Sequence, residues 1–256
     1  MNKIALITGA ASGIGKATAI ALAKESYDLI LTGRRIQLLE KLKEELCQSY
    51  PVEISILEMD VRNTADTMEK INKLSNRWKN IDLLVNNAGL AAGFEHFQDA
   101  DFADWNNMID TNIRGLLAVS QPVSKFMVNN KKGHIINISS IAGTQTYEKG
   151  NVYCATKHAV EAISKSMRID FLKHGIRVST ISPGAVETGF SLVRFKNDST
   201  KAAQVYEGYE PLEPGAVADA IVYAATRPAN VNINYIELTP KSQANAFYLN
   251  RQTQPL

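Results

Sequence analysis

Tyr153 and Lys157 form the pair of residues whose types and spacing most directly suggest chemistry. They stand four positions apart in a stretch with helical periodicity, so both side chains share one face of a helix. A free tyrosine has a pKa of about 10, and a neighbouring ammonium lowers it toward the range that suits proton exchange near neutrality. The pair therefore predicts a general acid and base. The same spacing also occurs where a tyrosine merely packs against a lysine stem.

Further polar residues fall where the chain is expected to leave a buried strand. Ser140 follows one such strand, Asn86–Gly89 ends another, and Pro183–Gly184 ends a third. Asn112 lies within a long predicted helix, where an amide is a poor filler and needs a partner. Ligands of open parallel sheets bind at the carboxyl ends of the strands. We therefore expect these residues to meet Tyr153 in one crevice.

A glycine-rich turn, Thr8-Gly9-Ala10-Ala11-Ser12-Gly13-Ile14-Gly15, links the first predicted strand to the first predicted helix. Glycines let the backbone approach a ligand closely, and a helix N-terminus offers free N–H groups to phosphate. The spacing differs from the common G-x-G-x-x-G pattern. An ordinary strand-to-helix turn would also contain glycines, but its place after the first strand favours a dinucleotide site.

The end of the second predicted strand bears on the choice of dinucleotide. Binders of NAD place an acidic residue there for the ribose 2′-hydroxyl, whereas arginine accommodates the 2′-phosphate of NADP. Here the strand ends in Gly33-Arg34-Arg35, and Asp28 stands at its opposite end. Arg34 or Arg35 can offer a planar guanidinium to phosphate. The pair could also be a solvated helix start, but we expect NADP(H) to be the cofactor.

Short apolar runs alternate with longer amphipathic segments, which predicts βαβ units and a parallel sheet. The runs that predict strands are Ile4–Ile7, Leu29–Thr32, Ile54–Leu57, Ile81–Val85, His134–Ile138, Arg177–Ile181 and Ile233–Leu238. The segments that predict helices are Gly15–Lys24, Ile36–Cys47, Ala65–Trp78, Trp105–Met127, Val152–Lys173 and Ala216–Thr226. We expect an α/β fold, one doubly wound domain over residues 1–256. The stretch 189–214 interrupts the alternation and predicts a substrate loop.

Composition excludes several other classes of function. A formal net charge of +2 gives no electrostatic case for nucleic acid. The two cysteines form no disulfide framework, and the four histidines lack metal-ligand spacing. No stretch has the roughly 18 apolar residues of a membrane span. We expect a cytoplasmic protein with no metal site and no membrane or nucleic-acid partner.

Taken together, the motifs resemble the short-chain dehydrogenase/reductase family and follow its order along residues 3 to about 190. The matching pieces are Thr8, Gly9-x-x-x-Gly13-Ile14-Gly15, Asp60-Val61, Asn86-Asn87-Ala88-Gly89, Asn112, Ser140, Tyr153-x-x-x-Lys157 and Pro183-Gly184. The resemblance implies a single Rossmann domain with a seven-stranded parallel sheet and helices on both faces. It also implies a homotetramer.

The resemblance further implies a role for each matching residue. Tyr153 would be the acid and base, Ser140 would bond the substrate oxygen, Lys157 would hold the nicotinamide ribose and tune Tyr153, and Asn112 would keep a water relay to Lys157. Other residues would bind the cofactor: Gly9, Ser12, Gly13, Ile14, Gly15, Arg34, Arg35, Asp60, Val61, Asn87, Ala88, Gly89, Pro183, Gly184, Val186 and Thr188.

A narrower resemblance concerns the substrate. Gly150–Tyr153, Glu187–Phe195 and Asn232–Asn234 are similar to segments of the NADP-dependent 3-hydroxy acid dehydrogenases. A small carboxylate substrate requires a cation, and Arg194 is the candidate, although it could equally be a loop surface residue or part of an internal ion pair. Two alternatives stay open: a reductase of other carbonyls such as 3-oxoacyl thioesters, and a non-catalytic NADP-binding regulator.

Overall fold

The computed structural model describes residues 2–251 and contains one seven-stranded parallel sheet in the order β3-β2-β1-β4-β5-β6-β7. The predicted domain, 1–256, extends past this range, since residues 1 and 252–256 lie outside the described part. The strands are β1 (Ile4–Thr8), β2 (Asp28–Gly33), β3 (Ile54–Glu58), β4 (Ile81–Asn86), β5 (His134–Ile138), β6 (Arg177–Pro183) and β7 (Tyr235–Leu238). The predicted α/β class and doubly wound sheet are confirmed.

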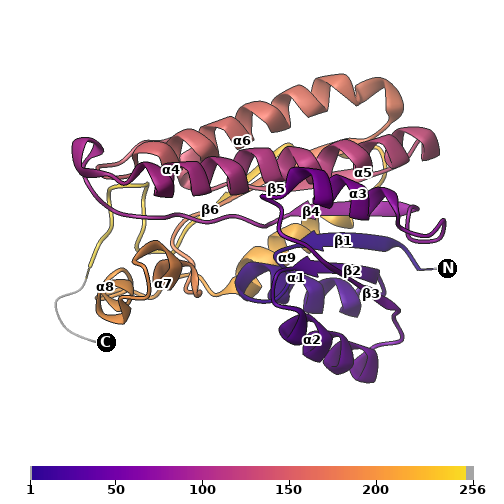
Figure 1. Ribbon diagram of the computed structural model, residues 1–256, viewed down its shortest axis with the longest axis horizontal. Coiled ribbons are helices and arrows are strands. Elements are labelled where there is room, and N and C mark those ends of the chain that lie inside the picture. The colour runs from indigo at the N-terminus through magenta and orange to yellow at the C-terminus, as the bar shows by residue number, and fades with distance from the viewer. Residues whose placement is uncertain (1, 252–256) are drawn as a thin grey trace.

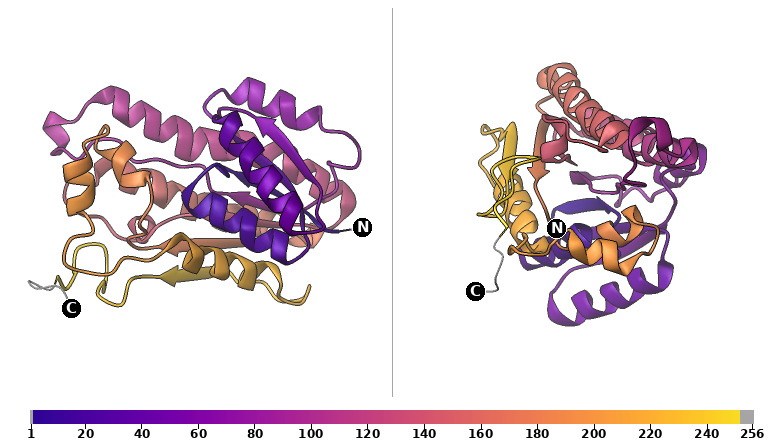
Figure 2. Two further views of the ribbon diagram at one scale, coloured as in Figure 1. Left: turned by 90° about the horizontal axis from the view of Figure 1, so that it is seen from below. Right: turned by 90° about the vertical axis from the view of Figure 1, so that its left-hand side faces the viewer.

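Helices cover both faces of this sheet (Figures 1 and 2). Strand β1 is apolar from Ile4 to Ile7 because both of its faces are buried. Ala5 and Ile7 pack into one hydrophobic cluster, whereas Ile4 and Leu6 pack into a second cluster on the opposite face. Alternate side chains of a strand point to opposite faces, so a strand buried on both faces has no polar side.

The helices divide between the two faces of the sheet. On one face lie α1 (Gly13–Lys24), α2 (Ile36–Ser49) and α9 (Pro214–Ala225); on the other lie α3 (Thr64–Asn72), α4 (Phe102–Ile109), α5 (Leu116–Asn130) and α6 (Asn151–Asp170). The short helices α7 (Phe190–Arg194) and α8 (Ser199–Gln204) stand beside the carboxyl ends of the strands, on the left of Figure 1. The remaining turns are η1 (Phe97–Asp99), η2 (Asp110–Gly115), η3 (Ile141–Gly143) and η4 (Leu172–His174).

Three predicted elements differ from the structure. The single helix expected over Trp105–Met127 is two helices joined by the π-helical turn η2. The helix expected over Ala65–Trp78 ends at Asn72, and the last strand begins at Tyr235 rather than Ile233. The loop 189–214 contains α7 and α8, which are too short to show a helical period.

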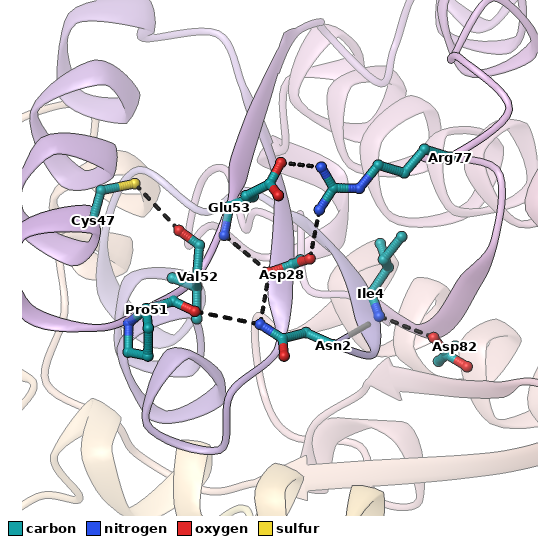
Figure 3. A network of polar contacts seen from close by, with 9 residues as sticks. All are labelled: Asn2, Ile4, Asp28, Cys47, Pro51, Val52, Glu53, Arg77 and Asp82. Atoms are coloured by element: carbon teal, nitrogen blue, oxygen red, sulfur yellow. Dashed lines mark hydrogen bonds and ion pairs between the residues drawn. The ribbon is translucent and has the colours of Figure 1, made fainter.

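A polar network fixes the edge of the sheet opposite the crevice, where the strands begin (Figure 3). Asp28 is 4% exposed and accepts hydrogen bonds from Asn2 Nδ2 at 3.1 Å and from the Glu53 amide at 2.9 Å. Arg77 bridges Asp28, at 2.8 Å, and Glu53. Asp28 therefore joins the starts of β2 and β3, at the opposite end of β2 from Arg34 and Arg35.

The segment after β7 packs against the chain that follows β6. Gln243 accepts a hydrogen bond from the Ala185 amide at 2.9 Å, and Arg251 donates to the Gln204 carbonyl, at the end of α8, at 3.2 Å. Over residues 2–251, no helix combines the length and the apolar character needed to cross a membrane. The same residues contain no group of three or more His, Cys, Asp or Glu side chains that could hold a metal ion.

Candidate active site

A cavity of about 480 Å³ lies along the carboxyl ends of the strands. It brings together residues that are distant in the sequence but were predicted to share a crevice. The predicted residues that line it are Gly9, Ser12, Gly13, Ile14, Arg34, Arg35, Asp60, Val61, Asn87, Ala88, Gly89, Ser140, Tyr153, Lys157, Pro183, Gly184, Val186 and Thr188. Three predicted residues, Gly15, Asn112 and Arg194, are not among its lining residues.

The glycine-rich turn is held close to the end of β4. Thr8 Oγ1 accepts hydrogen bonds from the amides of Asn87 and Ala88, each at 2.9 Å. A Cβ atom on Gly15 would stand 2.3 Å from the Gly9 carbonyl oxygen, so only glycine fits there. Gly15 therefore permits the tight turn and does not itself face the cavity. Gly9 has a φ of 66°, a conformation that glycine adopts without strain.

Guanidinium groups gather at one end of the cavity, where β2 and β3 finish. Arg35 Nη2 donates to Ser12 Oγ at 2.6 Å and so ties this end to the glycine-rich turn. Arg34 Nη1 lies 3.9 Å from Asp60 Oδ2. Arg62, which sequence reasoning missed, also lines the cavity and forms an ion pair with Asp60 at 2.6 Å. Because Arg62 stands two residues after the predicted site residue Asp60, this spacing could have indicated that Arg62 also lines the cavity.

Tyr153 and Lys157 are brought to the middle of the cavity by α6. Their exposed fractions are only 8% and 7%, which excludes a solvated tyrosine lying on a lysine stem. Lys157 Nζ donates to the Ile138 carbonyl at 3.0 Å and lies 6.0 Å from the centre of the Tyr153 ring. Ser140 caps the turn η3 by accepting a hydrogen bond from the Ala142 amide at 3.1 Å.

Burial makes the largest contribution to the pKa shifts of both residues, and neighbouring groups modify it. Burial raises the pKa of Tyr153 above its ordinary value, and the negative charge of ionised Tyr147 adds to the increase, whereas the Ser140 hydroxyl and the positive charge of Arg194 lower it. Burial also lowers the pKa of Lys157 to about 8, although the negative charge of Glu161 opposes that decrease. Both side chains are thus displaced toward their neutral forms.

Asn112 occupies the wide turn η2 and has the partner that its burial demands. Its Oδ1 accepts from the Leu90 amide at 2.9 Å, while Nδ2 donates to the Leu90 carbonyl at 2.8 Å and to Thr156 Oγ1 at 3.0 Å. A Cβ atom on Gly89 would lie 3.3 Å from Asn112 Oδ1 and 3.6 Å from Lys157 Nζ. Asn112 thus connects the end of β4 to α6 from behind the cavity wall.

Arg194 lies against Tyr153 at the end of α7. Its Cζ is 5.7 Å from the Tyr153 ring centre, 5.6 Å from that of Tyr147 and 4.6 Å from that of Phe94. Nη1 donates to the Tyr147 hydroxyl at 3.1 Å, and Nε is buried without a hydrogen-bond partner. Among the residues that the structure describes, no carboxylate pairs with Arg194. The alternative of an internal ion pair is therefore wrong within that range.

The lining of the cavity fits a dinucleotide. Glycine backbone at the start of α1 is open to phosphate, and Arg34 and Arg35 supply positive charge at the far end. Thr32 and Thr111 each carry a buried hydroxyl without a protein partner, and both line the cavity. Residues of the lining that were not predicted include Arg62, Leu90, Phe190 and Val193.

A doubly wound sheet with a glycine-rich phosphate turn and a buried tyrosine–lysine pair at its carboxyl edge defines an enzyme that binds a dinucleotide. The chain belongs to the short-chain dehydrogenase family, whose model, described as short chain dehydrogenase, matches residues 3–198. It is therefore an oxidoreductase.

Known proteins resemble the chain over nearly its full length. The NADP-dependent 3-hydroxy acid dehydrogenase YdfG of Escherichia coli K12 is 43% identical over 244 residues, 95% of this chain and 97% of that protein. Sulfoacetaldehyde reductase 2 of Chromohalobacter salexigens is 41% identical, with 98% and 100% covered. The closed form of serine dehydrogenase complexed with NADP+ superposes with a TM-score of 0.91 at 43% identity, covering 98% of this chain and 100% of that one.

Proposed function

We propose that this enzyme interconverts a small 3-hydroxy acid and its carbonyl form with NADP(H). The observation that carries the proposal is Arg194, a half-buried guanidinium that lies against Tyr153. A half-buried cation that has no counter-ion among residues 2–251 favours an anionic ligand, and a guanidinium matches the geometry of a carboxylate. The similarity to 3-hydroxy acid and serine dehydrogenases supports the same substrate class.

Tyr153 exchanges the proton of the reacting hydroxyl. The bound nicotinamide cofactor supplies or accepts the hydride. In oxidation the Tyr153 phenolate takes the hydroxyl proton, and in reduction its phenol returns a proton to the carbonyl oxygen. Ser140, whose hydroxyl lies beside Tyr153, holds that oxygen by a hydrogen bond. Arg194 holds the carboxylate, which fixes the distance between the reacting carbon and Tyr153.

Lys157 and Asn112 support Tyr153. In this proposal Lys157 binds the ribose hydroxyls and favours the phenolate by its charge. Because its pKa is near 8, it carries that charge over most of the neutral range. Asn112 holds the end of β4 against α6 and keeps a water relay to Lys157. The glycine turn binds the pyrophosphate and Arg34 with Arg35 binds the 2′-phosphate.

The same cation also favours a second candidate substrate, a small sulfonate aldehyde. A sulfonate is a monoanion with hydrogen-bond acceptors similar to those of a carboxylate, and one relative is a sulfoacetaldehyde reductase. A 3-oxoacyl thioester is disfavoured, because its uncharged chain would leave the Arg194 guanidinium, packed among Phe94, Tyr147 and Tyr153, without an anionic partner.

The proposal extends to the loop and the assembly. Residues 189–214 form the substrate loop, which presents Arg194 through α7. Exposed apolar side chains on α5 and beyond the end of α6, such as Leu117 at 42% and Leu172 at 78%, support a homotetramer assembled through these helices. A cytoplasmic location follows from the scarcity of cysteine and stays a prediction.

One substrate panel tests the proposed function. Purified enzyme receives NADP+ or NAD+ with serine, allo-threonine, 3-hydroxypropionate or 3-hydroxybutyrate, or NADPH with sulfoacetaldehyde or a 3-oxoacyl thioester, and absorbance of the reduced cofactor is followed. We expect oxidation of the hydroxy acids with NADP+. Faster turnover with NAD+ than with NADP+ would contradict the assignment of NADP(H) as the cofactor. Activity on the thioester alone would contradict a 3-hydroxy acid as the substrate.

A further inference from the structure

Asp60 introduces a negative charge beside the arginines that are proposed to bind the 2′-phosphate. It follows β3 and lines the same cavity as Arg34 and Arg35. Its Oδ2 atom lies 3.9 Å from Arg34 Nη1, so a phosphate held by Arg34 would stand within a few ångströms of a carboxylate. A like charge at this distance opposes binding. The arrangement needs a compensating group to favour a phosphorylated ribose.

Arg62 provides that compensation through several contacts with the same carboxylate. Its Nε donates to Asp60 Oδ1 and Oδ2, each at 3.0 Å, and its Nη2 donates to Oδ2 at 2.6 Å. Its backbone amide also donates to Oδ1 at 3.1 Å. Hydrogen bonding by Arg62 holds the pKa of Asp60 below its ordinary value, so the carboxylate is ionised and paired at neutral pH.

The guanidinium is also tied to α4. Arg62 Nη1 donates to Asn107 Oδ1, on α4, at 3.2 Å. The pair thus stands between the end of β3 and α4, with Asp60 turned toward Arg34. This end of the cavity is lined by three arginines, Arg34, Arg35 and Arg62, and by the single carboxylate of Asp60, so its net charge is positive.

We propose that Arg62 is a determinant of cofactor selectivity, because its ion pair with Asp60 neutralises a carboxylate that would otherwise repel the 2′-phosphate of NADP(H). The inference rests on the proposed use of NADP(H). It assigns Arg62 a role through Asp60 rather than a direct contact with the phosphate. Loss of Arg62 leaves Arg34 and Arg35 in place but exposes the phosphate to Asp60.

The test measures binding of 2′,5′-ADP and 5′-ADP by calorimetry, which needs neither substrate nor turnover. The readout is the ratio of the two affinities, because a general disturbance of the adenosine site weakens both ligands alike. Partly screened Coulomb interaction over about 7 Å corresponds to a change of about five- to fiftyfold in this ratio. We expect Arg62→Gln to lower the ratio by such a factor.

Asp60→Asn separates a charge effect from a structural one. If the pair acts by charge, Asp60→Asn raises the ratio, and the double variant Asp60→Asn/Arg62→Gln returns it toward that of the wild type. If the pair only holds the turn in place, both single variants break it and shift the ratio in the same direction, which would overturn the proposal. Arg227→Gln, at a partly buried arginine after α9 that does not line the cavity, is the matched loss of charge and should leave the ratio unchanged.

The outcomes distinguish this proposal from the proposed function. A wild-type protein that binds both nucleotides equally contradicts NADP(H) as cofactor and, with it, the role of Arg62. A wild-type protein that prefers 2′,5′-ADP, together with an Arg62→Gln variant of unchanged ratio, contradicts Arg62 alone. Thermal unfolding of each variant confirms that the compared proteins are folded.

Discussion

Replacement of Arg194 by methionine tests whether this residue binds the substrate carboxylate. Methionine keeps an unbranched side chain between Phe94, Tyr147 and Tyr153 but removes the charge and the hydrogen-bond donors. A hydrogen bond to a charged group contributes roughly 1.5–3 kcal/mol, and this one would form in a half-buried site. A loss of about 2–3 kcal/mol corresponds to a decrease of about 30- to 150-fold in kcat/KM.

The assay compares a 3-hydroxy acid with its methyl ester, each with saturating NADP+. In the wild type the acid should react with the higher kcat/KM. Arg194→Met should lower kcat/KM for the acid by the stated factor and leave the ester nearly unchanged. Arg194→Lys keeps the charge but loses the planar pair of donors, so its kcat/KM for the acid should lie between those of the wild type and Arg194→Met.

Stability provides a second measurement on the same variant. Arg194 Nε is buried without a partner, so its removal relieves a desolvation cost, but it also removes the hydrogen bond from Nη1 to the Tyr147 hydroxyl. Because these two effects oppose each other, the unfolding temperature of Arg194→Met should stay close to that of the wild type. Equal loss of activity on acid and ester would refute the reasoning, because it would show that Arg194 shapes the loop instead of binding the carboxylate.

Three further predictions concern the proton donor, the buried histidine and the glycine turn. Tyr153→Phe should reduce turnover by at least about a thousandfold while NADPH binding, followed by fluorescence, stays close to that of the wild type. Burial, with a smaller contribution from Arg177, lowers the pKa of His134 from 6.5 to about 3. Between these two pH values the native state therefore binds fewer protons than the unfolded state. The free energy of unfolding should then fall by at most about 1.4 kcal/mol for each pH unit from 6.5 down to 3, and His134→Gln should remove that slope in urea titrations at pH 4.5 and 7. Gly15→Ala should lower both the unfolding temperature and the affinity for NADPH, because its Cβ would meet the Gly9 carbonyl oxygen at 2.3 Å; an unchanged affinity would show that the turn tolerates the added atom.

The parts of the site that the sequence predicted are those that depend on one chain segment. The glycine turn, the strand ends and the pair of Tyr153 with Lys157 each follow from local spacing, and the structure gathers them in one cavity. Arg62 was not predicted as a site residue, because its contact with the cofactor end of the cavity arises only when β2 and β3 lie side by side. No local pattern of charges reports that Asp60 stands 3.9 Å from Arg34.

Other differences arise from geometry that leaves little trace in the sequence. Asn112 was expected to need a partner, and it has one, yet the π-helical turn that carries it has the same apolar spacing as an ordinary helix. The helices α7 and α8 have five and six residues, fewer than two helical turns each. The sequence allowed Arg194 to be named as a cation for the substrate. Its contacts with three aromatic rings could not be predicted, because they depend on how α7 packs against α6 and the segment that follows β4.

The wide turn η2 constrains how this helix can change in length. A π-helical turn contains one residue more than the α-helical turn it replaces, and each residue of an α-helix advances the side chains by about 100° around the axis. Removing one residue from 110–115 would therefore let the turn close to α-helical geometry, which keeps α4 and α5 in phase but moves Asn112 relative to Leu90 and Thr156. A homologous sequence without the wide turn should align with a one-residue gap in this segment, while Val119 and Val123 keep their places in the core.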